Sequence, residues 1–165
     1  MAGARVSEEN LEILQWNARG ISNNDSDLRA LFTTHTPQIV AIQETWLKYK
    51  EGENNTPHYS CYNPYRMDRK IGNKKYGGIL MLIRTDLLYN KKILKPYKTN
   101  NGILGTLEIQ AVTIKSNSQE IDIVNIYNPP SNNLTITEFK HYFSQINKNY
   151  FIVGDFNAHH HLWEP

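Results

Sequence analysis

This sequence is short of cysteine, of long apolar runs and of excess charge of one sign. The single cysteine, Cys61, excludes an internal disulfide and is typical of a reducing compartment. No stretch reaches the roughly 18 apolar residues of a membrane-spanning helix. Residues 1–9 lack the apolar core of a secretory signal. The formal net charge is only +2, weaker than that of a strongly basic, stand-alone nucleic-acid binder. We therefore expect an intracellular protein without a membrane segment.

The positive charges are unevenly placed along the chain. Several fall between residues 66 and 75, opposed by Asp68 alone: Arg66, Arg69, Lys70, Lys74 and Lys75. A second basic group lies between Lys91 and Lys98. Such runs are most often solvated loops, but a local cluster also attracts polyanions when the net charge is small. The first group, called the basic cluster below, is therefore a candidate contact for nucleic-acid phosphates.

Short apolar runs alternate with amphipathic segments, as expected of an α/β protein. Apolar or alternating patterns predict strands over 11–16, 39–42, 59–65, 79–83, 103–114, 120–127 and 150–153. The polar turn 115–119 favours an antiparallel hairpin between the two strands that flank it. No repeat or linker divides the chain, which predicts one domain over residues 1–165. The mixture of strand pairs and covering helices favours an α/β sandwich of partly antiparallel sheets.

Two helices are predicted from capping residues and apolar spacing. The first has N-cap chemistry in residues 25–27 and ends before Pro37. The second begins at Thr135, which has capping-box spacing to Glu138. The apolar face of this second helix is predicted to comprise Ile136, Phe139, Phe143 and Ile146.

Polar side chains occur where several predicted strands end. These residues are Asn17, Glu44, Tyr127, Asp155 and Asn157. Each has an ordinary alternative: the chain contains 19 asparagines, Glu44 alone could be an exposed charge, and Gly154–Asn157 alone could be a turn. Functional groups gather at the carboxyl ends of strands in α/β sheets, so the ordered set favours a common site.

The chemistry of this set favours a hard cation. Carboxylate, carboxamide and phenol oxygens suit Mg²⁺ or Mn²⁺ better than zinc. Such a cation neutralises phosphate charge, while a carboxylate orients or deprotonates water and amide or phenol donors stabilise the transition state. The set therefore predicts phosphodiester hydrolysis.

The same residues resemble a known superfamily. The motifs are, in chain order, Gln15–Gly20 (QWNARG), Gln43–Leu47 (QETWL), Tyr76–Gly78 (YGG), Ile126–Ser131 (IYNPPS) and Gly154–His160 (GDFNAHH). Together they resemble the endonuclease/exonuclease/phosphatase superfamily, and within it the apurinic-endonuclease-like domain of non-LTR retrotransposons, which nicks target DNA to prime reverse transcription. The resemblance spans Leu11 to Trp163 and implies a four-layered, DNase I-like α/β sandwich.

The resemblance also implies a role for each site residue. Glu44 would be the principal Mg²⁺ ligand, with Asn17 beside it. Asp155 would position or activate the attacking water, or protonate the leaving oxygen. Asn157 would hold a phosphate oxygen, and Tyr127 would contact the phosphate or its transition state. The basic cluster falls where members of the superfamily approach duplex DNA.

The sequence departs from the family pattern in two places. Pro130 stands where relatives have an asparagine, and neither Asn128 nor Asn132 is at an equivalent position. The family's later strands, a second acidic residue and a closing Asp-His pair are expected beyond Pro165, so the resemblance implies a C-terminally incomplete sandwich. The run His159–His161 could attract a transition metal, but the resemblance makes these histidines ordinary loop residues.

The leading prediction is a metal-dependent endonuclease domain that nicks DNA for retrotransposition. It would belong to a longer polyprotein with a reverse transcriptase, and a DNA substrate suggests a nuclear location. The alternative is a catalytically inactive remnant, or a nucleic-acid-binding fragment of such a domain. A third possibility keeps the fold and changes the substrate to a lipid headgroup or an abasic site.

Overall fold

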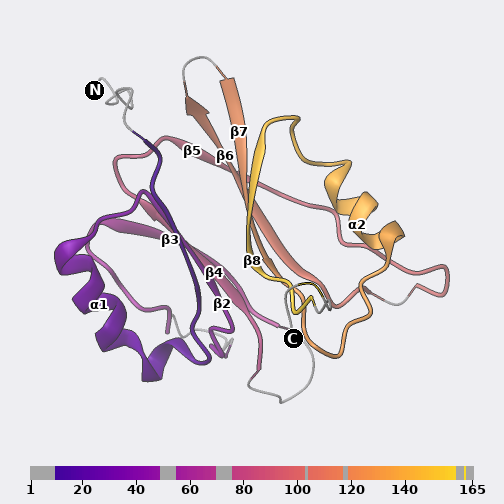
Figure 1. Ribbon diagram of the computed structural model, residues 1–165, viewed down its shortest axis with the longest axis horizontal. Coiled ribbons are helices and arrows are strands. Elements are labelled where there is room, and N and C mark those ends of the chain that lie inside the picture. The colour runs from indigo at the N-terminus through magenta and orange to yellow at the C-terminus, as the bar shows by residue number, and fades with distance from the viewer. Residues whose placement is uncertain are drawn as a thin grey trace.

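The computed structural model describes residues 10–48, 55–69, 76–102, 104–116, 119–158 and 162. Two β-sheets face each other across a common core (Figure 1). The first sheet has the strand order β1-β2-β4-β3. Its strands are β1 (Ile13–Asn17), β2 (Ile39–Gln43), β3 (Tyr62–Met67) and β4 (Ile79–Arg84). β1 runs parallel to β2, and the other pairs are antiparallel.

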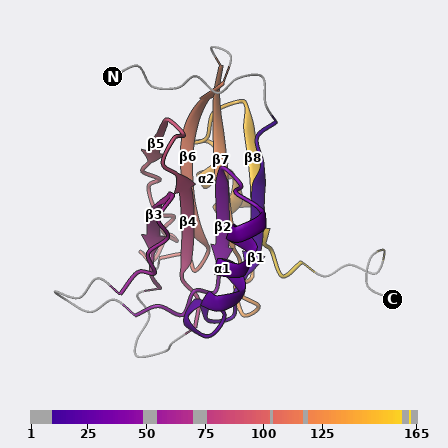
Figure 2. The ribbon, with the colours of Figure 1, turned by 90° about the vertical axis from the view of Figure 1, so that its left-hand side faces the viewer.

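The second sheet has the strand order β5-β6-β7-β8. Its strands are β5 (Tyr89–Lys92), β6 (Glu108–Ser116), β7 (Gln119–Tyr127) and β8 (Tyr150–Asp155). β7 runs parallel to β8, while β5, β6 and β7 form an antiparallel meander. Each sheet therefore has one parallel pair, β1 with β2 and β7 with β8. The two pairs lie side by side across the sandwich, as the view in Figure 2 shows.

Helices cover the outer faces of the two sheets (Figure 1). The helix α1 (Asp25–Thr34) follows a short 3-10 helix, η1 (Ile21–Asn23), and packs Leu28 onto the first sheet. The helix α2 (Ile136–Phe143) packs Tyr142 onto the second sheet. A third apolar cluster fills the space between the sheets. The result is a four-layered α/β sandwich, which confirms the predicted fold class.

Several element boundaries differ from the prediction. β3 begins at Tyr62 rather than Tyr59, because Tyr59 accepts the Tyr62 backbone N–H in a turn at 3.0 Å. The polar strand β5 was missed, since Tyr89–Lys92 is an edge strand without an apolar pattern. Residues 104–107 precede β6 rather than belong to it, and the hairpin strands extend to Ser116 and Gln119. The α1 N-cap is Asn24, whose side chain makes no capping hydrogen bond.

The predicted apolar face of α2 is wrong in part. Thr135 caps the helix as predicted, because its Oγ accepts the Glu138 backbone N–H at 3.1 Å. Ile136 and Phe139 are exposed, however, and the buried positions are Glu138 and Tyr142. The Tyr142 hydroxyl accepts the Tyr97 backbone N–H at 3.2 Å. Glu138 and Tyr142 therefore face the segment that precedes β6. Within the described part of the chain, no helix is long and apolar enough to cross a membrane.

Candidate active site

The strand ends of the two parallel pairs bring the predicted residues together. Asn17 ends β1 and is paired in register with Gln43, the last residue of β2. Tyr127 ends β7 and is paired with Asp155, the last residue of β8. β1 and β8 are also in contact across the two sheets. Four strands therefore end side by side, and Glu44 follows directly after one of them.

Asn17 connects the two carboxylates of the site. Its Nδ2 donates to Glu44 Oε1 at 2.9 Å and to Asp155 Oδ2 at 2.6 Å. Its Oδ1 accepts the Arg19 backbone N–H at 3.2 Å. One amide from the first sheet therefore links an acid that follows β2 to an acid at the end of β8. Because the Asn17–Asp155 bond crosses between sheets, the site depends on their relative position.

The backbone at these strand ends takes an unusual conformation. Among the residues that the structure describes, four non-glycine residues have positive φ angles: Arg19 (42°), Glu44 (52°), Trp46 (53°) and Asn157 (42°). This left-handed region is uncommon for residues with a side chain, and such residues cluster at functional sites. Backbone hydrogen bonds from Gly20 to Glu44 (2.8 Å) and from Trp46 to Gly77 (2.9 Å) hold the loop after β2 in place. The chain thus fixes the Glu44 carboxylate by its backbone as well as by its partners.

Tyr127 faces the Glu44 carboxylate. The tyrosine is buried, and the charge of the nearby Glu44 carboxylate acts on its hydroxyl. Burial is the main cause that raises the pKa of Tyr127 well above its ordinary value, and the Glu44 charge adds to it. The phenol therefore stays protonated and remains a hydrogen-bond donor. Trp46 Nε1 donates to the other Glu44 oxygen, Oε2, at 3.2 Å.

Asn157 is held in the loop after β8 by Asp155 and Asn128. The Asn157 backbone N–H donates to Asp155 Oδ1 at 3.0 Å, and its Nδ2 donates to the Asn128 carbonyl at 2.8 Å. Asn128 is buried, and its own Nδ2 donates to the Phe156 carbonyl at 3.0 Å. Asn132 in turn donates to Asn128 Oδ1 at 2.8 Å. The two asparagines beside Pro130 thus support the loop that carries Asp155 and Asn157.

An ion pair that the sequence did not indicate lies next to this set. Glu108 at the start of β6 is buried, pairs with Arg69 Nε and accepts the Gly78 backbone N–H at 2.7 Å. Burial raises the pKa of Glu108, although Arg69 and the Gly78 hydrogen bond act in the opposite direction. The Arg69 guanidinium carbon lies 5.5 Å from the centroid of the Tyr127 ring. Glu108 alternates with Leu107 and Ile109, as an exposed residue of an amphipathic strand does, so the local pattern did not mark it as buried.

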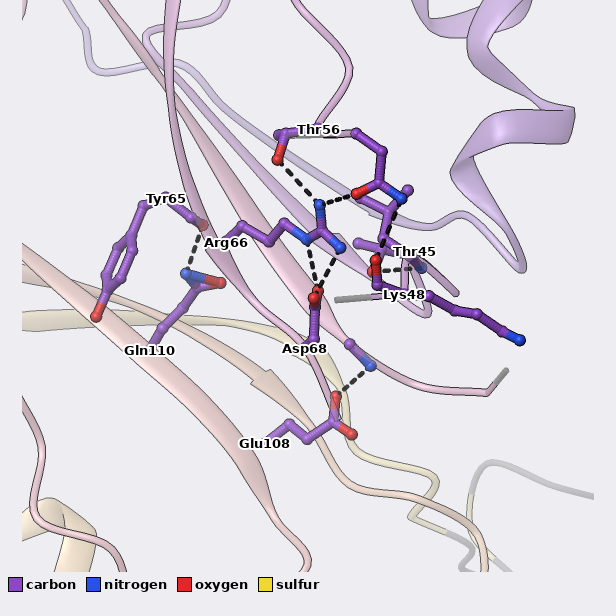
Figure 3. A network of polar contacts seen from close by, with 11 residues as sticks. Thr45, Lys48, Thr56, Tyr65, Arg66, Asp68, Glu108 and Gln110 are labelled. Atoms are coloured by element: carbon purple, nitrogen blue, oxygen red, sulfur yellow. Dashed lines mark hydrogen bonds and ion pairs between the residues drawn. The ribbon is translucent and has the colours of Figure 1, made fainter. Parts of the chain in front are cut away.

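The basic cluster is described only at its first two members. Arg66 donates to both Asp68 oxygens, at 2.6 and 2.7 Å, and its Nη1 donates to Asn55 at 2.6 Å and Thr56 at 3.1 Å (Figure 3). Arg69 pairs with Glu108. Both arginines are therefore engaged with protein oxygens. Lys70, Lys74, Lys75 and His159–His161 lie outside the residues that the structure describes.

Buried amides lie directly beneath the site, between the sheets. Gln43 Nε2 donates to Asn125 Oδ1 at 2.7 Å, and Asn125 Nδ2 lies 3.4 Å from Gln110 Oε1. Asn125 Nδ2 also approaches the Ile42 and Leu80 carbonyls, at 3.2 and 3.3 Å. Gln43 on β2 directly precedes Glu44, and Asn125 on β7 lies two residues before Tyr127. They connect the two sheets by directional bonds next to the residues that must meet.

The donor set at the strand ends suits a hard divalent cation. Glu44 and Asp155 provide carboxylate oxygens, and Asn17 supports both through its Nδ2, while its Oδ1 accepts the Arg19 backbone N–H. Mg²⁺ and Mn²⁺ prefer such oxygen ligands and often take one or two carboxylates, with water or substrate completing the shell. Over the described ranges, no group of three or more His, Cys, Asp or Glu side chains could hold a metal ion. The fit therefore rests on two acids with amide support, rather than on a closed metal cage.

Comparison with protein families adds an independent finding. Residues 14–165 match the sequence model of the "Endonuclease/Exonuclease/phosphatase family". The RNA-directed DNA polymerase from mobile element jockey of Drosophila melanogaster is 25% identical over 158 residues, which are 96% of this chain and 16% of that protein. The probable RNA-directed DNA polymerase from transposon BS of the same species is 28% identical over 154 residues. The chain thus spans about 16% of the length of these curated relatives.

Solved structures share the fold at low sequence identity. The endonuclease domain of TRAS1, a telomere-specific non-LTR retrotransposon, has a TM-score of 0.60 and 21% identity, covering 92% of this chain and 63% of that one. The catalytic domain of Xenopus laevis APE2 has a TM-score of 0.58 and 14% identity, covering 90% of this chain and 59% of that one. At these identities the likeness shows the fold alone.

Proposed function

The chain belongs to the endonuclease/exonuclease/phosphatase family, and we propose that its strand-end site hydrolyses phosphodiester bonds of duplex DNA with a bound divalent cation. The observation that carries this proposal is the Asn17 amide, which joins Glu44 and Asp155 across the two sheets. Two carboxylates fixed on one amide, with a protonated phenol beside them, form the set that phosphodiester hydrolysis requires.

Glu44 and Asn17 would hold Mg²⁺ or Mn²⁺. Two bonds orient the Glu44 carboxylate, from Asn17 at 2.9 Å and from Trp46 at 3.2 Å. Such partners fix a ligand's orientation before a metal arrives. When bound, the cation would neutralise charge on the scissile phosphate and favour attack by water. Asp155 is one hydrogen bond away, through the same amide, so the cation site and the proton-transfer site share one support.

The remaining residues act on the proton and on the phosphate. Asp155 would orient or deprotonate the attacking water, or protonate the leaving oxygen. Its carboxylate is held by Asn17 at Oδ2 and by the Asn157 backbone N–H at Oδ1. Tyr127 and Asn157 would donate hydrogen bonds to phosphate oxygens, and the raised pKa of Tyr127 keeps its donor proton in place.

The relatives suggest a biological setting for this reaction. Two of them are named RNA-directed DNA polymerases of a mobile element and a transposon, and TRAS1 is named a non-LTR retrotransposon. The proposed role is to nick target DNA for retrotransposition, within a polyprotein that also carries a reverse transcriptase. With a DNA target, the proposed step would take place in the nucleus. Lys70, Lys74 and Lys75, together with Arg66, are proposed to approach the DNA backbone.

Nicking of supercoiled plasmid tests the proposal. The chain is incubated with plasmid in Mg²⁺ or in EDTA, beside Glu44→Gln, which keeps the shape of the side chain and removes its charge. We expect Mg²⁺-dependent nicking that falls by at least about 100-fold in Glu44→Gln. Glu120→Gln is the matched control, because Glu120 is an exposed acid on the hairpin and pairs only loosely with Lys115, at 3.9 Å.

The same assay separates the alternatives. Folded protein that binds DNA but never nicks it would favour the inactive remnant or binding fragment. Equal nicking by wild type and Glu44→Gln would contradict the assignment of Glu44. Parallel reactions with abasic duplex DNA and with a phosphoinositide test the substrate class, because neighbours of the same fold include AP endonucleases as well as a 3' phosphatase.

A further inference from the structure

Arg69 lies beside the site, although by sequence it belongs to the basic cluster. Its guanidinium carbon is 5.5 Å from the centroid of the Tyr127 ring, within the range of a cation–π contact. Its Nε pairs with the buried Glu108 carboxylate, and only 18% of the Arg69 side chain is exposed. Arg69 is therefore packed into the protein between an acid and an aromatic ring, rather than extended toward solvent.

The backbone at Gly77 is shaped to admit this pair. A Cβ at Gly77 would lie 2.6 Å from Arg69 Nε and 2.7 Å from Glu108 Oε1, and the φ of +90° already disfavours a side chain. The Gly78 backbone N–H donates to the second Glu108 oxygen at 2.7 Å (Figure 3). The Tyr76–Gly78 motif thus both makes room for the ion pair and anchors its acid.

Arg69 and Arg66 use their guanidinium groups differently. Arg66 donates from Nε, Nη1 and Nη2 to oxygen acceptors. Arg69 Nη2 is buried and has no hydrogen-bond partner among the described residues. A buried donor without an acceptor lowers stability. A guanidinium kept in that state and placed against Tyr127 indicates a role at the site, since all three guanidinium nitrogens of Arg66, in the same segment, have acceptors.

We infer that Arg69 is a positioning residue for Tyr127: held by Glu108 and the Gly77–Gly78 backbone, it supports the phenol ring so that the hydroxyl stays next to the Glu44 carboxylate. The inference deepens the proposed function and rests on it for its kinetic consequence. It assigns Arg69 to the interior of the site and leaves DNA contact to the other members of the basic cluster.

Kinetics of plasmid nicking distinguish a role of Arg69 in positioning Tyr127 from a role in contacting DNA. The variants are Arg69→Met, which keeps much of the side-chain volume without the charge, and Arg69→Lys as the conservative replacement. A misplaced Tyr127 hydroxyl lowers kcat, and we expect a loss of about 100-fold in Arg69→Met with KM for DNA nearly unchanged. Arg69→Lys should recover part of the loss. Arg84→Met is the matched control, because Arg84 pairs with Asp86 at 2.7 Å near the opposite end of β4.

A second readout does not depend on activity. Fluorotyrosine is incorporated and the Tyr127 fluorine resonance is assigned by its loss in Tyr127→Phe. We expect this resonance to move in Arg69→Met and in Gly77→Ala, which displaces the ion pair from the other side, and to stay in place in Arg84→Met. Thermal unfolding of each variant establishes that the folded protein is being compared.

Two results would overturn the inference. One is a Tyr127 resonance that is unchanged in folded Arg69→Met. The other is a rise in KM with an unchanged kcat, which would make Arg69 an ordinary DNA contact. If wild type does not nick DNA at all, the proposed function fails, while the fluorine resonance still decides whether Arg69 positions Tyr127.

Discussion

The layer between the two sheets is apolar at one end and hydrogen-bonded at the other. Away from the site it consists of aliphatic side chains, mainly Ile39, Met81, Ile83, Val112, Ile114 and Ile123. Beneath the site the same strands carry Gln43, Gln110 and Asn125. Apolar burial is non-directional and tolerates small shifts between the sheets. Amide hydrogen bonds are directional, so they fix the sheets where residues from both must meet.

The need to hold the two sheets in a fixed relative position explains why buried amides occupy places where aliphatic side chains would pack well. Asn17 comes from the first sheet and Asp155 from the second, and their hydrogen bond is 2.6 Å long. A small slide between the sheets would break it. Asn125 lies two residues before Tyr127 and bonds Gln43, which directly precedes Glu44. The hydrogen bond between these amides therefore fixes the two sheets relative to each other within two residues of the site.

The largest expected effect is at Gly154, where β8 enters the site. A Cβ there would lie 1.9 Å from the Ile126 carbonyl oxygen, which is backbone and cannot move aside. Gly154→Ala should therefore lower the free energy of unfolding by more than about 4 kcal/mol. Gly102→Ala is the control, since nothing lies within 4 Å of its added Cβ and only its φ of +75° adds strain. Equal chemical-denaturation midpoints for the two variants would contradict the crowding at Gly154.

The next effect should separate the two ends of the inter-sheet layer. Asn125→Leu leaves Gln43 Nε2 without its 2.7 Å acceptor and buries a leucine among amides and carbonyls, so it should cost about 3 kcal/mol. Ile123→Val, two residues away in the apolar half, should cost about 1 kcal/mol. Among folded molecules, only Asn125→Leu should also lose Mg²⁺ binding. Loss of binding in both variants would mean that the amides have no special role.

The smallest expected effect is a dependence of the free energy of unfolding on pH, caused by two buried glutamates. Burial raises the pKa of Glu108 and of Glu138 above the ordinary 4.5. In the folded state these groups therefore keep their protons to higher pH than in the unfolded state. Stability from this source is greatest at acidic pH and falls as pH rises from about 4.5 through the raised values. Glu138→Gln should flatten this slope in unfolding measured between pH 4 and 7, and an unchanged slope would exclude Glu138 as its source.

Strand ends and motifs predicted which residues the fold brings together, while the roles of these residues in metal binding and hydrolysis stay predictions. Asn17, Glu44, Tyr127 and Asp155 each follow or end a strand; Asn17 donates to both acids, and Tyr127 lies beside Glu44. The meeting of these residues was predictable because parallel strands bring their carboxyl ends to one edge. It required only the order of the strands, and no knowledge of how side chains pack.

What the sequence did not reveal depends on contacts between distant residues. Glu108 and Arg69 are 39 positions apart, and neither carries a local sign of its partner. The amides Gln43 and Asn125 are 82 positions apart and interrupt apolar strands, but no sequence pattern indicates that they face each other. On α2, a capping pattern placed Thr135 correctly, but the choice of buried face was decided by the segment that packs against Glu138 and Tyr142.

Calorimetric titration of Mg²⁺ into the chain and into Glu44→Gln is the direct test of the proposed cation site. Mg²⁺ is preferred to Mn²⁺, because His159–His161 could bind a transition metal independently of the site. We expect one binding event in the wild type that weakens by at least about tenfold in Glu44→Gln. Equal binding by the two proteins, or no binding by the folded wild type, would contradict the cation site on which the proposed hydrolysis depends.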